Sequence, residues 1–294
     1  MANNTKVITQ SEGKNFIIYN GDCVEVSKGI PSNSIHFSVY SPPFSSLYTY
    51  SNSDRDMGNN KGDDAFWEHY KFMLQDQFRI TMPGRLVSVH CMNLPTSKQN
   101  HGYIGIRDFR GEIIRAYLAA GFIYHSEVCI WKDPVTAMQR TKALGLLHKQ
   151  VKKDSCMSRQ GIPDYLCTFR KPGDNPERVT HTGETFPVQL WQQYASPVWM
   201  DINPSDTLQR ESAREDNDER HIAPLQLQVI ARAIELWTNE HDIVFSPFAG
   251  IGSEGYQALK MGRRYVGIEL KESYYRQAVL NLKAEDSMRE QELL

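Results

Sequence analysis

The chain has 294 residues, of which 40% are hydrophobic and 23% charged, with a formal net charge of −2 at pH 7. This length suits one large α/β domain with an insertion, and the composition is that of an ordinary globular protein. No apolar run approaches the roughly 20 residues of a membrane span, and the N-terminus lacks the apolar core of a secretory signal, so we expect a cytoplasmic protein without membrane association. The net charge excludes a global attraction to nucleic acid.

Five cysteines are scattered through the chain and form no Cys-x-x-Cys pair. Their odd number argues against a disulfide framework, and their spacing argues against a zinc site. We therefore expect reduced, mostly buried thiols and no bound metal.

Short apolar runs alternate with amphipathic segments along most of the chain. The predicted strands lie over residues 15–19, 35–40, 85–90, 122–131, 164–169, 242–245 and 264–269. The predicted helices lie over residues 24–30, 66–82, 112–120, 224–237 and 253–261, and Pro224 is expected as the first residue of its helix. This alternation is typical of an α/β fold with a doubly wound, mostly parallel sheet.

A glycine-rich turn between a predicted strand and a predicted helix contains Phe248, Gly250 and Gly252. Small residues let a ligand approach the backbone, and the first N–H groups of the helix are free to bind it. Glu269 ends the next predicted strand, where a carboxylate can accept hydrogen bonds from the ribose hydroxyls of an adenosine cofactor. Each feature alone is equally compatible with an ordinary loop, but together they predict a cofactor site.

The sequence Ser41-Pro42-Pro43-Phe44 follows directly after the predicted strand over residues 35–40. Two prolines supply no backbone donors, so this turn offers carbonyl oxygens and the Ser41 hydroxyl beside an aromatic ring. An amino group that must become nucleophilic needs acceptors for its N–H bonds and a flat partner for the ring that carries it. Taken alone, the motif is also compatible with an ordinary Pro-Pro loop.

These motifs, in this order, resemble those of the β-group DNA amino-methyltransferases, in which the catalytic motif precedes the cofactor motif. The matching segments are residues 20–23, 41–44, 221–224, 246–252 and 265–269. The resemblance, which is strongest to solitary enzymes without a nuclease partner, implies a Rossmann-like fold that uses S-adenosylmethionine. It also implies methylation of the exocyclic amino group of a flipped base in double-stranded DNA, and it makes a homodimer an expectation.

The resemblance assigns roles to the matching residues. The catalytic residues would be Ser41, Pro42, Pro43 and Phe44. The cofactor residues would be Asp22 and Cys23 at the adenine, Glu269 at the ribose, and His221, Pro224, Phe248, Gly250 and Gly252 around the methionine end, with Ser246 also expected in the cofactor site. The chain departs from the family at Ser246, where Asp is usual, and at Glu254, where a hydroxyl residue is common, so we expect these two contacts to differ.

Residues 131–159 form a basic segment that we expect to bind DNA phosphates, the alternative being a solvated, lysine-rich loop. The expected contacts are Arg140, Lys142, Lys149, Lys152 and Lys153. In a second irregular stretch, Trp191, Tyr194 and Trp199 are expected either to contact bases or to form a small core.

Long irregular stretches inside a compact enzyme are often functional loops or an inserted recognition unit. We therefore divide the chain into a catalytic half over residues 1–131, a DNA-contacting and target-recognition region over residues 132–220, and a cofactor-binding half over residues 221–294 that completes the same domain.

Several alternatives concern the reaction itself. A C5-cytosine methyltransferase is set aside because none of the five cysteines follows a proline. A methyltransferase acting on other substrates and a catalytically inactive DNA-binding module stay open. For the target base, Ser-Pro-Pro-Phe is the form most often associated with N4-cytosine enzymes, whereas the likeness of the whole chain to solitary β-group enzymes favours adenine. We predict N6-adenine methylation, with N4-cytosine methylation as the alternative.

Overall fold

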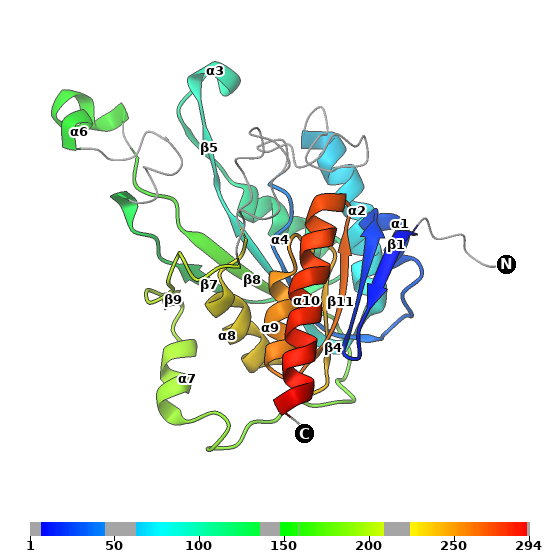
Figure 1. Ribbon diagram of the computed structural model, residues 1–294. Coiled ribbons are helices and arrows are strands. Elements are labelled where there is room, and N and C mark those ends of the chain that lie inside the picture. The colour runs from blue at the N-terminus through cyan, green and yellow to red at the C-terminus, as the bar shows by residue number, and fades with distance from the viewer. Residues whose placement is uncertain (1–6, 45–62, 136–147, 158, 209–223, 293–294) are drawn as a thin grey trace.

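The protein is described by a computed structural model over residues 7–44, 63–135, 148–157, 159–208 and 224–292. Within these ranges one large sheet contains β1 (Val7–Glu12), β2 (Phe16–Gly21), β3 (Ile35–Tyr40), β4 (Thr81–Met92), β7 (Ile123–Ile130), β8 (Asp164–Arg170), β9 (Val198–Trp199), β10 (Ile243–Ser246) and β11 (Arg264–Glu269) (Figure 1). A separate hairpin of β5 (Leu94–Thr96) and β6 (Gly105–Arg107) follows β4.

The strand order of the large sheet is β1-β2-β11-β10-β3-β4-β8-β7-β9. The strands from β2 to β4 run parallel to one another, whereas β1 and β8 are antiparallel to their neighbours. The expected α/β fold with a mostly parallel sheet is confirmed. Parallel strands end at the same edge of the sheet. The residues that follow the parallel strands therefore lie on one side of the molecule; these strands are β2, β3, β4, β10 and β11.

Helices cover both faces of the sheet (Figure 1). One face packs against α8 (Leu227–Trp237), α9 (Ser253–Lys260) and α10 (Glu272–Glu292), and the other against α1 (Cys23–Ser27), α2 (Asp63–Ile80) and α4 (Phe109–Ala119). Side chains alternate across β3, so Phe37 and Val39 join the first core and Tyr40 joins the second. The short helices are α3 (Lys98–His101), α6 (His148–Asp154), the 3₁₀ turn η3 (Ser155–Met157) and α7 (Val188–Tyr194). No described helix is both long enough and apolar enough to cross a membrane.

The prediction that Pro224 begins a helix is wrong. Helix α8 begins three residues later, at Leu227, with Gln226 as its N-cap. Leu225 is buried in the core, and the Leu227 N–H group donates to the carbonyl of Asp206. The burial of Leu225 and the hydrogen bond of Leu227 hold the residues directly after Pro224 in a non-helical conformation, so the helix begins only after Leu225 has packed into the core.

Among the described residues, nine elements had no counterpart among the predictions: β1, β5, β6, β9, α3, α6, α7, α10 and the 3₁₀ turn η3. The edge strand β1 is largely exposed, and the long helix α10 forms most of the polar C-terminal segment. Helix α10 is held by the packing of Ala278 and Leu282 in the core rather than by a regular apolar stripe. Strand β8 lies between β4 and β7, so the range that we assigned to DNA-contacting loops also contains a buried strand of the sheet.

Candidate active site

Ser41 follows the last residue of β3, and its side chain begins a chain of polar contacts. Its hydroxyl oxygen lies 2.6 Å from Nδ1 of His90, near the end of β4. The other ring nitrogen of His90, Nε2, lies 3.2 Å from Oδ2 of Asp164, which begins β8. Lys132 Nζ donates a hydrogen bond of 2.5 Å to Oδ1 of the same carboxylate. The Ser41 hydroxyl is therefore connected through an imidazole ring to a buried acid.

The charge of Asp164 is set by its two neighbours. Burial would raise the pKa of this carboxyl group, but the charges and hydrogen bonds of His90 and Lys132 outweigh burial and lower the pKa. Asp164 is thus ionised at neutral pH and favours the His90 tautomer that carries its proton on Nε2, although the contact does not have the geometry of a well-aligned hydrogen bond. With its proton on Nε2, His90 presents Nδ1 as an acceptor to the Ser41 hydroxyl.

The sequence reasoning did not identify His90 or Asp164 as site residues. His90 ends one predicted strand and Asp164 begins another. A polar residue at the end of a strand was the only feature of the sequence that could have marked them as site residues. They meet because β8 runs antiparallel to β4, with Met92 opposite Asp164. Lys132 belongs to the basic segment, but its ammonium group is paired with Asp164.

Phe44 and Phe248 are partly buried aromatic rings, each packed against another ring. The Phe44 ring meets the Phe109 ring edge-on at 6.0 Å between centroids. The Phe248 ring packs at 5.7 Å against Tyr40, the residue directly before Ser41. The contact of Tyr40 with Phe248 places the 41–44 motif next to the glycine-rich turn, although about two hundred residues of chain separate them. The structure therefore brings the two principal motifs together.

Glu269 is held in a fixed orientation at the end of β11. Its Oε2 accepts a hydrogen bond of 2.8 Å from the N–H group of Gly250, and its Oε1 accepts one of 2.8 Å from the N–H group of Lys271. The side-chain amide of Asn20 donates to the carbonyl oxygens of Glu269 and Leu270 at 2.8 and 3.0 Å. Each carboxylate oxygen thus accepts a hydrogen bond from a backbone N–H group, which fixes the direction that the carboxylate faces.

Cys23 lies close enough to Asp22 and Glu269 for both carboxylates to act on its thiol. The Asp22 carboxylate caps α1 by accepting a hydrogen bond of 2.9 Å from the Val24 N–H group. Cys23 is buried, and burial followed by the negative charges of Asp22 and Glu269 raises its pKa well above the ordinary value. The Cys23 thiol therefore stays protonated and behaves as a small apolar group.

The glycine turn adopts the backbone that its sequence requires. Gly250 and Gly252 have φ angles of 54° and 87°, in the left-handed region that other residues rarely adopt. A Cβ atom at Gly252 would come within 3.2 Å of Ala278 on α10, whereas one at Gly250 would meet open space. Ser246, just before the turn, is completely buried, and its hydroxyl has no hydrogen-bond partner among the described residues.

The remaining predicted residues are only partly described. His221, Arg140 and Lys142 lie outside the described residues, and Pro224 is partly buried ahead of α8. The other predicted DNA contacts, all exposed on α6, are Lys149, Lys152 and Lys153. Helix α6 follows β7 and projects beyond the sheet on the same side as the β5–β6 hairpin (Figure 1).

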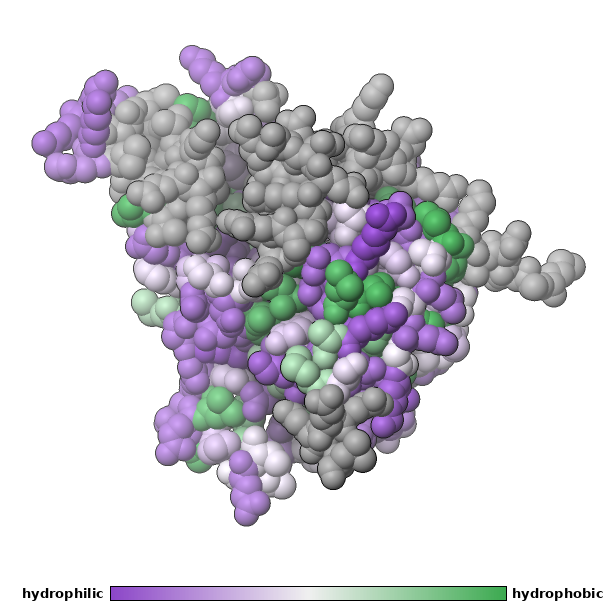
Figure 2. All heavy atoms as spheres, viewed as in Figure 1, coloured by the Kyte–Doolittle hydropathy of each residue, from purple (hydrophilic) through white to green (hydrophobic). Residues whose placement is uncertain are grey.

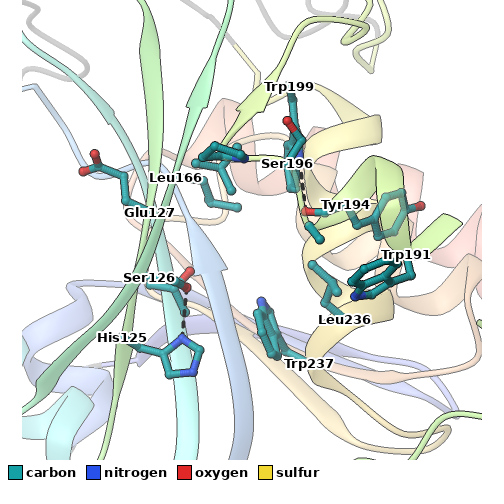
Figure 3. Close-up of a pocket in the computed structure, with 14 residues that line it drawn as sticks. His125, Ser126, Glu127, Leu166, Trp191, Tyr194, Ser196, Trp199, Leu236 and Trp237 are labelled. Carbon is teal, nitrogen blue, oxygen red and sulfur yellow. Dashed lines mark hydrogen bonds between the residues drawn. The ribbon is translucent and has the colours of Figure 1, made fainter. Parts of the chain in front are cut away.

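A pocket of about 340 Å³ lies between β7 and β8 on one side and α7 and α8 on the other (Figure 3). Trp191, Tyr194 and Trp199 line this pocket, and no residue of the Ser41 site does. Trp199 is 1% exposed and its ring NH donates to the carbonyl of Tyr194, while the guanidinium of Arg232 packs over both rings. These contacts support the small-core interpretation for Tyr194 and Trp199, while Trp191 stays half exposed.

A second polar cluster lies at the opposite edge of the sheet. His36, Glu177 and Asp242 place ligand-type atoms within 4.8 Å of one another, a spacing that a metal site would need. However, the buried Arg85 guanidinium donates to Asp242, and His36 Nδ1 accepts a hydrogen bond of 3.1 Å from the Ile243 N–H group. Because Arg85 already supplies the positive charge, this cluster is better suited to hold strands together than to bind a cation.

Comparisons with known proteins agree with this geometry. Residues 35–280 match a family model described as DNA methylase, the N6/N4 group. The chain is 23% identical over 262 residues to the Type II methyltransferase M.BamHI of Bacillus amyloliquefaciens, covering 86% of this chain and 54% of that protein. The chain thus spans about half the length of that relative.

Two solved structures share the fold. A DNA modification methylase of Thermus thermophilus described as putative, TTHA0409, complexed with S-adenosyl-L-methionine, has a TM-score of 0.66 at 20% identity, covering 92% of this chain and 96% of that one. The cytosine-N4-specific PvuII DNA methyltransferase has a TM-score of 0.67 at 15% identity, covering 94% of this chain and 90% of that one. Since the family model spans most of the sequence, the chain belongs to the N6/N4 DNA methylase family.

Proposed function

We propose that this protein transfers a methyl group from S-adenosylmethionine to the exocyclic amino group of a base in double-stranded DNA. The observation that carries this proposal is the position of Ser41, which lies beside the glycine turn through the Tyr40–Phe248 contact and whose hydroxyl faces His90 Nδ1. Membership of the N6/N4 DNA methylase family supports the same reaction.

The residues around the glycine turn fit S-adenosylmethionine. Glu269, oriented by the N–H groups of Gly250 and Lys271, would hold the ribose hydroxyls, and Asp22 and Cys23 would adjoin the adenine. The open space beside Gly250 leaves room for the rest of the molecule. The cofactor would supply a methyl group already activated on a sulfonium, so the protein needs only to align and activate the amine.

Ser41 and Pro42 would activate the amino group. The Ser41 hydroxyl oxygen and the Pro42 carbonyl oxygen can each accept a hydrogen bond from the base NH₂, and these bonds strengthen as positive charge develops on the nitrogen. The amine must lose one proton in the reaction. Ser41 would accept it while passing its own hydroxyl proton to Nδ1 of His90, and ionised Asp164 would stabilise the resulting imidazolium. Phe44 would stack on the flipped base.

The reaction is tested by incubating the purified protein with DNA and radiolabelled S-adenosylmethionine. We expect label in DNA from the wild type, and a large loss of turnover in Ser41→Ala and Phe44→Ala with cofactor affinity unchanged in calorimetric titration. Label in protein or small molecules instead of DNA would support a methyltransferase for another substrate. Binding of DNA without any transfer would support the inactive DNA-binding module.

The target base is a separate proposal. We propose N6 of adenine, supported by the overall likeness to solitary β-group enzymes, while N4 of cytosine presents the same two N–H donors to Ser41 and Pro42. Mass spectrometry of nucleosides from the methylated DNA distinguishes the two products. N4-methylcytosine without N6-methyladenine would show that the adenine proposal is wrong.

The DNA surface and the assembly state also stay proposals. Lys149, Lys152 and Lys153 would contact phosphates from α6, on the side of the sheet edge where Ser41 lies. Arg140 and Lys142 would extend the same basic segment. Sedimentation of the free protein would test the expected homodimer.

A further inference from the structure

A carboxyl group is buried beneath the glycine turn with no basic side chain beside it. Glu254 is the second residue of α9 and is 4% exposed. Burial raises its pKa to about 8, although its own backbone N–H group lowers the pKa and the charge of Glu269 raises it further. The α10 side chains that pack against this turn of α9 are Ala278 and Leu282, which are apolar. Among the described residues no cation pairs with Glu254.

Two other buried polar atoms accompany this carboxyl group. The hydroxyl groups of Ser246 on β10 and Tyr265 on β11 are buried near each other, and neither has a well-aligned hydrogen-bond partner among the described residues. Burial and then the charge of Glu254 raise the pKa of Tyr265, while the Ser246 hydroxyl lowers it, so the three groups lie together. Added Cβ atoms at Gly255 and Gly267 would lie 2.5 and 2.7 Å from the Tyr265 ring. Two glycines thus make room for the phenol.

The charge balance of this region favours a cationic ligand. Glu254 and Glu269 are both acidic, and ionisation of Glu254 beside Glu269 is unfavourable in the free protein. A permanent cation close to both groups would reverse that preference, because opposite charges at low local dielectric attract strongly. Methyl transfer turns the sulfonium cation of the donor into an uncharged thioether. A carboxylate here can therefore distinguish the donor from the product.

Building on the methyltransferase function proposed above, we propose that Glu254 is the counter-charge for the sulfonium group and makes the cofactor site prefer the charged methyl donor over the uncharged product, S-adenosylhomocysteine. At neutral pH the free carboxyl group is protonated, and it ionises when the donor is bound. Donor binding should then release a proton to solvent. The product carries the same amino acid and adenosine groups, so a comparison of the two isolates the effect of the sulfonium charge.

The experiment is calorimetric titration of the protein at pH 7 with S-adenosylmethionine and S-adenosylhomocysteine, each in two buffers of different ionisation enthalpy. For the wild type we expect release of roughly one proton with the donor and none with the product. Donor affinity should rise with pH up to about 8 and level off above it, because only the ionised group attracts the cation. Glu254→Gln should abolish the proton release, flatten this pH dependence and lower the donor preference by about tenfold or more.

Glu272→Gln is the matched control, because Glu272 is an exposed glutamate of α10 that pairs with Arg276. It should behave as wild type, and thermal melting of all three proteins checks that Glu254→Gln is folded. Equal proton release and equal donor preference in wild type and Glu254→Gln would overturn the role of Glu254 and leave the methyltransferase proposal intact. Failure of the wild type to bind either compound would instead overturn both proposals.

Discussion

The hydroxyl oxygen of Ser41 lies 2.6 Å from Nδ1 of His90, although 49 residues separate the two in the chain. They meet because β3 and β4 are adjacent parallel strands that end at the same edge of the sheet, with Tyr40 opposite Val89. A serine hydroxyl alone is a weak proton acceptor at neutral pH. The His90 imidazole beside it gives the amine proton a destination within the protein.

His90→Gln tests this assignment. Glutamine keeps a polar group at the position but cannot take up a proton, so turnover should fall by about a hundredfold while the affinity for S-adenosylmethionine stays unchanged. Steady-state kinetics measure turnover and calorimetric titration measures the cofactor affinity, and a variant with wild-type turnover would leave His90 with a merely structural role.

Asp164 links the site to acid stability. Its pKa is lower in the folded protein than its usual value because His90 and Lys132 outweigh the effect of burial. A lowered folded pKa contributes stability at neutral pH that is lost as pH falls through that pKa. Asp164→Asn should therefore cost about 3 kcal/mol of unfolding free energy at pH 7, because it leaves Lys132 without its counter-charge.

Urea denaturation from pH 7 to below pH 4 measures this difference. The loss caused by Asp164→Asn should shrink as the pH falls through the lowered pKa. Asp154→Asn, at an exposed aspartate of α6, is the control and should leave the curve unchanged. A constant difference between Asp164→Asn and wild type at every pH would contradict the ionised state of Asp164.

The lysines of α6 test the DNA surface. Replacing Lys149, Lys152 and Lys153 by Ala should weaken binding to duplex DNA and reduce the slope of log affinity against log salt by about 0.9 for each lost phosphate contact. Lys260→Ala and Lys283→Ala, exposed lysines of α9 and α10, should leave the slope unchanged. Fluorescence anisotropy over a salt series gives the slope. An unaltered slope in the triple variant would place the DNA on another face.

Arg85 and Asp242 test the opposite edge of the sheet. Both side chains are almost fully buried, and the guanidinium also donates to the carbonyls of His36 and Glu177 at 2.9 and 3.0 Å. Asp242→Asn leaves a buried cation without its partner and should lower the unfolding free energy by about 3 to 5 kcal/mol. The control Asp174→Asn, at an exposed aspartate, should be neutral in thermal or chemical denaturation. A neutral Asp242→Asn would show that the backbone carbonyls alone satisfy Arg85.

Figure 2 shows one face of the molecule, with hydrophilic side chains over much of the described surface and hydrophobic ones in smaller groups. The exposed large apolar residues include Val188, Trp191 and Met200, which all belong to the stretch around α7 and β9. The sequence pattern around these three residues did not predict that their side chains are exposed rather than buried in the core.

The sequence by itself determined the local elements and the two principal motifs. The limits of β3 and β11 agree with the predicted ranges, because an apolar run bounded by turn residues is a local signal that needs no partner. The glycines at 250 and 252 were likewise identifiable, since the backbone that they adopt is one that few other residues tolerate.

Only the tertiary structure decided which strand ends meet. It joined Ser41 to His90 and Asp164, paired Lys132 with a carboxylate and buried Glu254 beside Glu269. It also overruled the proline signal at the start of α8, because burial of Leu225 outweighs a local helix preference. Each of these contacts depends on the strand order and on pairing between segments that are far apart in the chain. The free energy that stabilises them comes from burial and charge pairing, and neither segment contains a local sequence signal that identifies its partner.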